Sequence, residues 1–151
     1  MEYMKLSDFL GSVWEARFQY RRCVSRVEEL QQRCTQVVTS WDCTPRGGGN
    51  SRRDGPLAAL ADQRALLPEL YRAWEGKEEE VERFLDKIED RRFRAILKLR
   101  YVDLFQWPRV VEELEKSGLY YSERQVFNLH RKALEQAEDL WQMEQQKEIS
   151  A

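Results

Sequence analysis

The sequence has few of the residues on which catalytic, metal-binding and disulfide-stabilised proteins depend. It contains one histidine and three cysteines, Cys23, Cys34 and Cys43. Their odd number and their spacing fit neither a disulfide framework nor a zinc site. No stretch approaches the roughly 18 apolar residues of a membrane span, and the N-terminus lacks the apolar segment of a signal peptide. We therefore expect a cytoplasmic protein with reduced thiols, no membrane partner and no bound metal.

Catalytic motifs are absent as well. The chain has no nucleophile elbow and no cluster of metal ligands, and its glycine run 47–49 lacks the Lys-Ser/Thr pair of a phosphate-binding loop. His130 has no second candidate ligand, so a surface or phosphate-facing position is its expected place. These absences predict that the protein is not an enzyme and needs no cofactor.

What the sequence does contain is charge, together with apolar residues at helical spacing. Charged residues make up 34% of the chain, which has only 7 glycines and 4 prolines, and this composition predicts an all-α protein. Residues 5–41 form one long expected helix whose apolar stripe starts at Leu6 and is interrupted by Arg17 and Gln31. Such a stripe resembles a coiled-coil seam, which can pack within one chain or between two chains.

A second helical stretch follows a loop. Residues 42–56 contain four glycines, two prolines and no large apolar residue, so we expect a flexible loop there. Residues 57–88 resume the apolar helical period, with a break or kink expected just before Pro68. Together the two stretches predict a long antiparallel, coiled-coil-like helical hairpin over residues 1–88.

The next part, residues 89–142, is expected to hold three helices with a tight turn between the last two. The first is expected to run on from the hairpin as far as residue 103. Trp107-Pro108 begins the second, because proline is tolerated in a first turn, and Gly118 ends it as a left-handed cap. This order is typical of a helix-turn-helix. Residues 143–151 are expected to form a polar, frayed tail.

The last of these helices carries the strongest local signals. The Ser122 hydroxyl can accept from the backbone N–H of Gln125, whose side chain can reach back to the N–H of Ser122, which is a capping box. Apolar residues at steps of three and four then form one face that must dock on the preceding helices. They are Val126, Leu129, Ala133 and Leu134. The opposite face is polar and carries Glu123, Arg124, Gln125, Asn128, Arg131 and Lys132.

The residue types on the polar face suit contact with double-stranded DNA. Arginine matches guanine O6 and N7, and glutamine and asparagine match adenine N6 and N7. The base-reading candidates are Arg124, Gln125 and Asn128, and the phosphate candidates are Arg131, Lys132, His130 and Tyr121. Residues 89–136 carry 10 basic and 8 acidic residues, whereas the stretches on both sides are acidic overall. This mild positive block predicts modest DNA affinity per protomer.

Several of these residues also have a purely structural interpretation. The capping box can consume Gln125, and Tyr121 can close the turn against Trp107. Glu123 can read a cytosine or simply favour the positive end of the helix dipole. The arginines at 91, 92 and 94 can touch the DNA backbone or form surface ion pairs with Glu89 and Asp90.

The run from Leu99 to Leu134 resembles region 4 of bacterial sigma factors and, more closely, the ArpU/RinA-like phage transcriptional regulators. The resemblance covers about a third of the chain, and its most diagnostic residues are Arg100-Tyr101, Trp107, Ser122, Gln125-Val126, Leu129-His130 and Ala133-Leu134. It implies a phage- or prophage-encoded regulator of late genes, located in the cytoplasm of the bacterial host. The family binds promoter DNA through a helix-turn-helix, with RNA polymerase as a possible second partner.

The sequence departs from the sigma-factor pattern at two places. Residues 119–121 lengthen the turn before Ser122, and Phe127 and Glu123 stand where sigma factors tend to carry basic residues. The promoter-reading code therefore does not carry over. Two other functions stay open. One is a small terminase-like DNA-packaging protein, which also joins a helix-turn-helix to coiled-coil helices. The other is a module that docks on RNA polymerase without reading bases. A homo-oligomer that forms through the N-terminal helices is compatible both with the DNA-packaging protein and with the transcriptional regulator.

Overall fold

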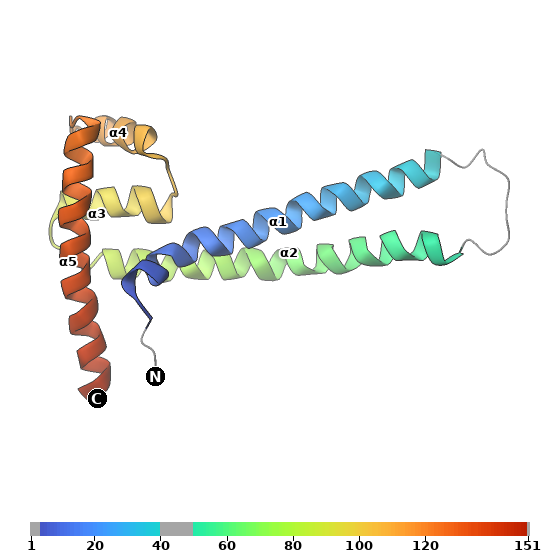
Figure 1. The fold of residues 1–151 in the computed structure, drawn as a ribbon, viewed down its shortest axis with the longest axis horizontal. Helices are drawn as coiled ribbons and strands as arrows, with labels where there is room; N and C mark the ends of the chain where they lie inside the picture. Colours follow the sequence, from blue (N-terminus) through green and yellow to red (C-terminus); the bar gives the residue numbers. More distant parts are fainter. Residues whose placement is uncertain (1–3, 40–49, 151) are drawn as a thin grey trace. The chain divides into compact units, whose positions relative to one another are not determined.

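The computed structural model describes residues 4–39 and 50–150, and every regular element within them is helical (Figure 1). The predicted all-α fold is thereby confirmed for this part of the chain. In chain order the elements are α1 (Leu6–Thr39), α2 (Asn50–Leu85), α3 (Arg91–Leu97), the π-helical segment η1 (Lys98–Val102), α4 (Trp107–Lys116) and α5 (Glu123–Ser150).

The helices form two compact units. One consists of residues Ala16–Glu75, and the other of Met1–Glu15 together with Gly76–Ala151, so α1 and α2 each contribute to both units. The sequence predicts a boundary between residues 88 and 89. In the structure, the part of α2 from Gly76 onwards belongs to the same unit as the C-terminal helices, and Val81 and Leu85 in this part are fully buried.

Within Ala16–Glu75, α1 and α2 pair with each other inside one chain. The Tyr20 ring contacts the Tyr71 ring at a centroid distance of 5.6 Å, and further along α1 Leu30 packs with Leu60. Residue numbers increase along α1 from Tyr20 to Leu30, while those of their partners on α2 decrease from Tyr71 to Leu60. The two helices are therefore antiparallel. This pairing agrees with the predicted hairpin. Of the two ways in which the apolar stripe could pack, within one chain or between two chains, the structure shows the first.

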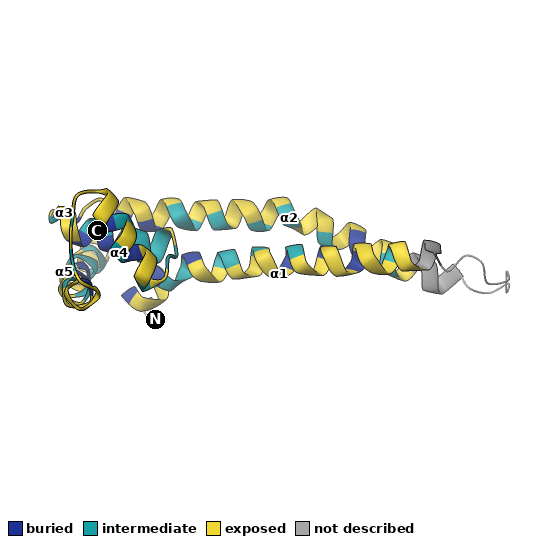
Figure 2. Ribbon diagram, turned by 90° about the horizontal axis from the view of Figure 1, so that it is seen from above, coloured by how far each residue is buried: buried dark blue, intermediate teal, exposed yellow. Residues whose placement is uncertain are grey.

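The seam of this unit is narrow, and most of the surface of both helices is exposed (Figure 2). Cys23 lies on this seam, and its Sγ donates a hydrogen bond to the carbonyl oxygen of Gln63 at 3.3 Å. The apolar stripe predicted for residues 5–41 passes from Tyr20 to Val24 and does not include Cys23. Leu57, the first residue of the apolar period predicted for residues 57–88, is 55% exposed. The helical period therefore predicted both helices correctly, but it assigned some residues to the wrong face of each helix.

The helix α2 differs from expectation at both ends and in the middle. It starts at Asn50, inside the predicted loop 42–56, whose residues up to 49 lie outside the described part. Of the break or kink expected before Pro68, the break is absent, since α2 continues through this residue. Pro68 is exposed, so water can satisfy the carbonyl that its missing N–H leaves free.

The chain also breaks where a continuous helix was expected. α2 ends at Leu85, and Asp90 starts α3 as an N-cap whose Oδ1 accepts from the backbone N–H of Arg92 at 2.9 Å. Conversely, α5 continues to Ser150 through the predicted frayed tail. Phe9, Phe84 and Trp141 hold this second half of α5, with ring centroids 4.8–5.6 Å apart.

Candidate functional site

The candidate site is built on the short core that joins α3, α4 and α5. Ile96, Val110, Leu114 and Val126 are at most 1% exposed and pack together. Half-buried side chains surround them, among them Leu99, Trp107, Leu119, Tyr121 and Leu129. The apolar face predicted for the last helix docks as expected, with Val126 and Ala133 fully buried. This core fixes the direction in which α5 leaves the turn.

The turn between α4 and α5 has two local devices that the sequence predicted. Pro108 lies in the first turn of α4, and Gly118 ends the helix at φ 88°. The N–H groups of Gly118 and Leu119 donate to the carbonyls of Glu115 and Leu114, both at 2.9 Å, which is a Schellman motif. Leu119 packs on the core, so the longer turn gains an apolar anchor.

The predicted capping box is present at the start of α5. The Gln125 N–H donates to Ser122 Oγ at 3.2 Å, and the Ser122 N–H donates to Gln125 Oε1 at 2.9 Å. These two bonds hold the Gln125 side chain against the helix end. Of the two interpretations of Gln125, the structure supports the cap, and we remove this residue from the base-reading candidates.

A polar surface lies along the first turns of α5, away from the core. We call Arg124, Asn128, Arg131 and Lys132 the open face of α5, and all four are exposed. In the described part of the chain no ion pair holds the three cations of this face, in contrast to Lys87 and Lys98, which pair with Glu144 and Asp86. The open face therefore presents charge that is available to a ligand.

His130 does not occupy the surface position expected for a phosphate contact. It is half-buried, its Nε2 shares a hydrogen bond with the Tyr101 hydroxyl at 3.0 Å, and its ring centroid lies 4.7 Å from that of Trp107. Burial, followed by the nearby Arg100 guanidinium, lowers the pKa of His130 to about 4. The ring is neutral at pH 7 and contributes to packing, which corrects the sequence-based assignment.

Tyr121 is also less free than a phosphate contact requires. It is half-buried against the same core on which Trp107 packs. The Asp90 carboxylate, which lies 3.2 Å from the guanidinium, and the Tyr121 hydroxyl both raise the pKa of Arg92. Asp90 and Arg92 thus form the surface ion pair that was one of the two interpretations of this arginine.

Two residues of the site were not assigned a role from the sequence. Arg100 Nη1 donates to the carbonyl oxygen of Phe105 at 2.9 Å, and its guanidinium lies over the Trp107 ring at 4.8 Å. It thereby braces the connection at Leu104, whose φ of 59° is rare for a residue other than glycine. Phe127 is 43% exposed and meets the Trp107 ring edge-on at 5.0 Å. The sequence does contain a signal for Phe127, because it is an aromatic residue among the polar residues of the face opposite the predicted apolar one.

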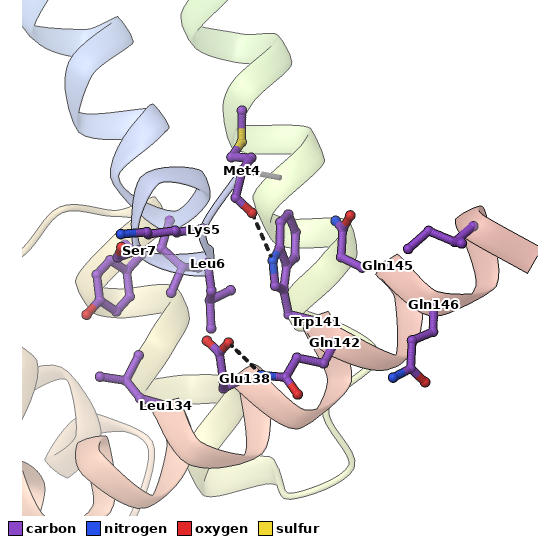
Figure 3. Close-up of a pocket in the computed structure, with 13 residues that line it drawn as sticks. Met4, Lys5, Leu6, Ser7, Leu134, Glu138, Trp141, Gln142, Gln145 and Gln146 are labelled. Atoms are coloured by element: carbon purple, nitrogen blue, oxygen red, sulfur yellow. Dashed lines mark hydrogen bonds between the residues drawn. The ribbon is translucent and has the colours of Figure 1, made fainter. Parts of the chain in front are cut away.

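A cleft of about 800 Å³ lies further along α5, beside the start of α1 (Figure 3). Trp141 lines it and donates its Nε1–H to the carbonyl oxygen of Met4 at 3.2 Å, while Gln142 donates to Glu138 at 3.3 Å. The lining is mainly apolar and amide-bearing and contains one carboxylate, Glu138.

No helix within residues 4–39 and 50–150 has both the length and the apolar character needed to cross a membrane. The same residues contain no group of three or more histidine, cysteine, aspartate or glutamate side chains arranged to hold a metal ion. No protein-family model, curated protein or solved structure matches the chain. The function must therefore be argued from the geometry of the site and from the sequence resemblance.

Proposed function

We propose that the protein is a sequence-specific, DNA-binding transcriptional regulator in which α4, the turn and α5 act as a helix-turn-helix. The observation that carries this proposal is the open face of α5. Its cations are exposed and unpaired within the described residues, on a helix whose start is fixed by a capping box and a buried core. An α-helix about 10–12 Å across fits a major groove about 12 Å wide.

Within this proposal the open face divides into two pairs. Arg124 and Asn128 lie one turn apart near the start of α5, the end that enters the groove in helix-turn-helix proteins. Arginine recognises guanine and asparagine recognises adenine through paired hydrogen bonds. Arg131 and Lys132 follow on the next turn, where phosphate contacts position the helix without reading sequence.

The resemblance to ArpU/RinA-like regulators refines the proposal. It supports a phage or prophage protein that acts on late-gene promoters, with RNA polymerase as a further partner. The open face has only three cations, so one protomer binds DNA weakly, and we propose that two copies act together on a paired site. These refinements rest on the resemblance and on the charge of the face.

Binding-site selection with the full chain over random duplexes, at low and moderate salt, tests the proposal. We expect an enriched motif that survives moderate salt. The Arg124→Ala/Asn128→Ala variant should lose the preference while keeping part of its non-specific binding. The matched control is Gln136→Ala/Lys147→Ala, which removes one amide and one cation from exposed positions elsewhere on α5.

Two results would contradict the proposal. A wild-type protein with no sequence preference at any salt concentration would leave only electrostatic attraction. A double variant that keeps the full preference would show that α5 does not read bases. Light scattering of the purified protein adds a further check, since the mass of an assembly with many protomers would favour the ring-forming DNA-packaging alternative over a regulator.

A further inference from the structure

Phe127 is an apolar residue in the middle of the open face. It lies three residues after Arg124 and four before Arg131, so all three share one side of α5. Its side chain is 43% exposed, whereas the neighbouring Val126 is fully buried. Val126 thus lies in the core, whereas a large part of the Phe127 ring faces outward.

The orientation of Phe127 is nevertheless fixed. Its ring contacts the edge of Trp107 at a centroid distance of 5.0 Å. Trp107 is itself held between the Arg100 guanidinium at 4.8 Å and the His130 ring at 4.7 Å. An exposed ring that is held in one place loses little conformational freedom when a ligand covers it.

We propose that Phe127 reads thymine by packing on its 5-methyl group in the major groove. This inference rests on the proposed function, since it requires α5 to enter the groove. A phenyl ring has no hydrogen-bond donor or acceptor for a base edge. Thymine carries the one apolar group that the four standard bases show in the major groove, and Phe is among the side chains that contact it. Phe127 then adds a thymine to the sequence that Arg124 and Asn128 select.

Replacing thymine by uracil tests this directly, because the replacement removes only the methyl group. In the selected duplex, each thymine is changed to uracil one at a time, and binding of the full chain is measured by fluorescence anisotropy. We expect one position at which the change weakens wild-type binding about fourfold, which corresponds to one buried methyl group. Phe127→Ala should bind the thymine and uracil duplexes equally at that position.

Matched variants separate methyl recognition from general damage. Tyr120→Ala removes a more exposed aromatic residue, 78% accessible, that lies outside the open face, and it should keep the fourfold ratio. Phe127→Gln retains side-chain length, and it should lose the ratio as Phe127→Ala does. Far-UV circular dichroism confirms that each variant is folded before binding is measured.

The inference is overturned if no thymine is sensitive to the replacement. It is also overturned if the sensitive thymine keeps its fourfold ratio in Phe127→Ala or Phe127→Gln. A wild-type protein that selects no motif gives a different result, since it refutes the proposed function itself.

Discussion

The sharpest physical prediction concerns His130. Its pKa falls from 6.5 in the unfolded chain to about 4 in the folded protein, because the ring is half-buried between Tyr101 and Trp107 and lies near the Arg100 guanidinium. The unfolded chain therefore binds a proton more tightly than the folded protein does. The corresponding stability is fully present above pH 6.5 and is lost as the pH falls from 6.5 towards 4.

The size of the effect follows from the shift. A change from 6.5 to about 4 corresponds to roughly 3 kcal/mol if the whole shift counts. Solvent still reaches part of the ring and screens its charge, so we expect a total of about 1–2 kcal/mol, with about 1 kcal/mol lost by about pH 5. His130 is the only histidine, so no second imidazole contributes.

The perturbation is His130→Gln, which does not titrate and can still hydrogen-bond to the Tyr101 hydroxyl. Urea unfolding followed by circular dichroism gives the unfolding free energy of both proteins over this pH range. Carboxylates titrate in both proteins, so the quantity of interest is the difference between them. We expect the wild type to lose about 1 kcal/mol relative to the variant on acidification.

Proton NMR gives an independent measurement, because the single imidazole has its own resolved signal. Its titration midpoint should lie well below 6.5. A wild-type-minus-variant difference that does not change with pH, together with a midpoint near 6.5, would refute the burial of His130 and the aromatic contacts that produce it.

Three substitutions test the devices that position α5. Gly118→Ala should cost about 1–2 kcal/mol in urea unfolding, because φ is 88° although an added Cβ meets no atom within 4 Å; an unchanged free energy would refute the left-handed cap. Ser122→Ala should cost about 1 kcal/mol, and a cost as large as that of a core residue would mean that Ser122 does more than cap α5. Ile96→Ala should cost about 2–5 kcal/mol, because the side chain is fully buried, and a loss under about 1 kcal/mol would contradict the described core.

The features that the sequence predicted correctly are those with a local cause. The capping box needs only Ser122 and Gln125, and the end of α4 needs only Gly118, so each can be recognised within a few residues. Pro108 marks the start of α4 for the same reason. The apolar face of α5 follows from helical period alone and was predicted correctly at Val126.

The features that the sequence missed depend on residues far apart in the chain. His130 is expected on the surface from the sequence, although Val126 and Ala133 of the predicted apolar face lie four residues before it and three after it. The contacts that bury it come from Tyr101 and Trp107, which belong to other elements. The end of α2 was assigned to the hairpin because Val81 continues its period, although that residue packs in the other unit. The break before α3 does have a local signal, because Asp90 is a good N-cap residue. The apolar period runs across this position and predicts a continuous helix instead.

The charge of the open face sets how the proposed DNA complex must be built. If Arg131 and Lys132 each neutralise one phosphate, a plot of the logarithm of the binding constant against the logarithm of the salt concentration has a slope of about −1.8. A fourfold rise in salt then weakens the binding of one protomer about 12-fold, and a single copy with so few phosphate contacts binds weakly. Two copies on a paired site double the slope to about −3.6, and Arg131→Ala should reduce it by about 0.9 per bound copy. A slope of about −1.8 on the selected duplex would mean that one copy suffices, and the base contacts proposed for Arg124, Asn128 and Phe127 would then have to supply most of the affinity.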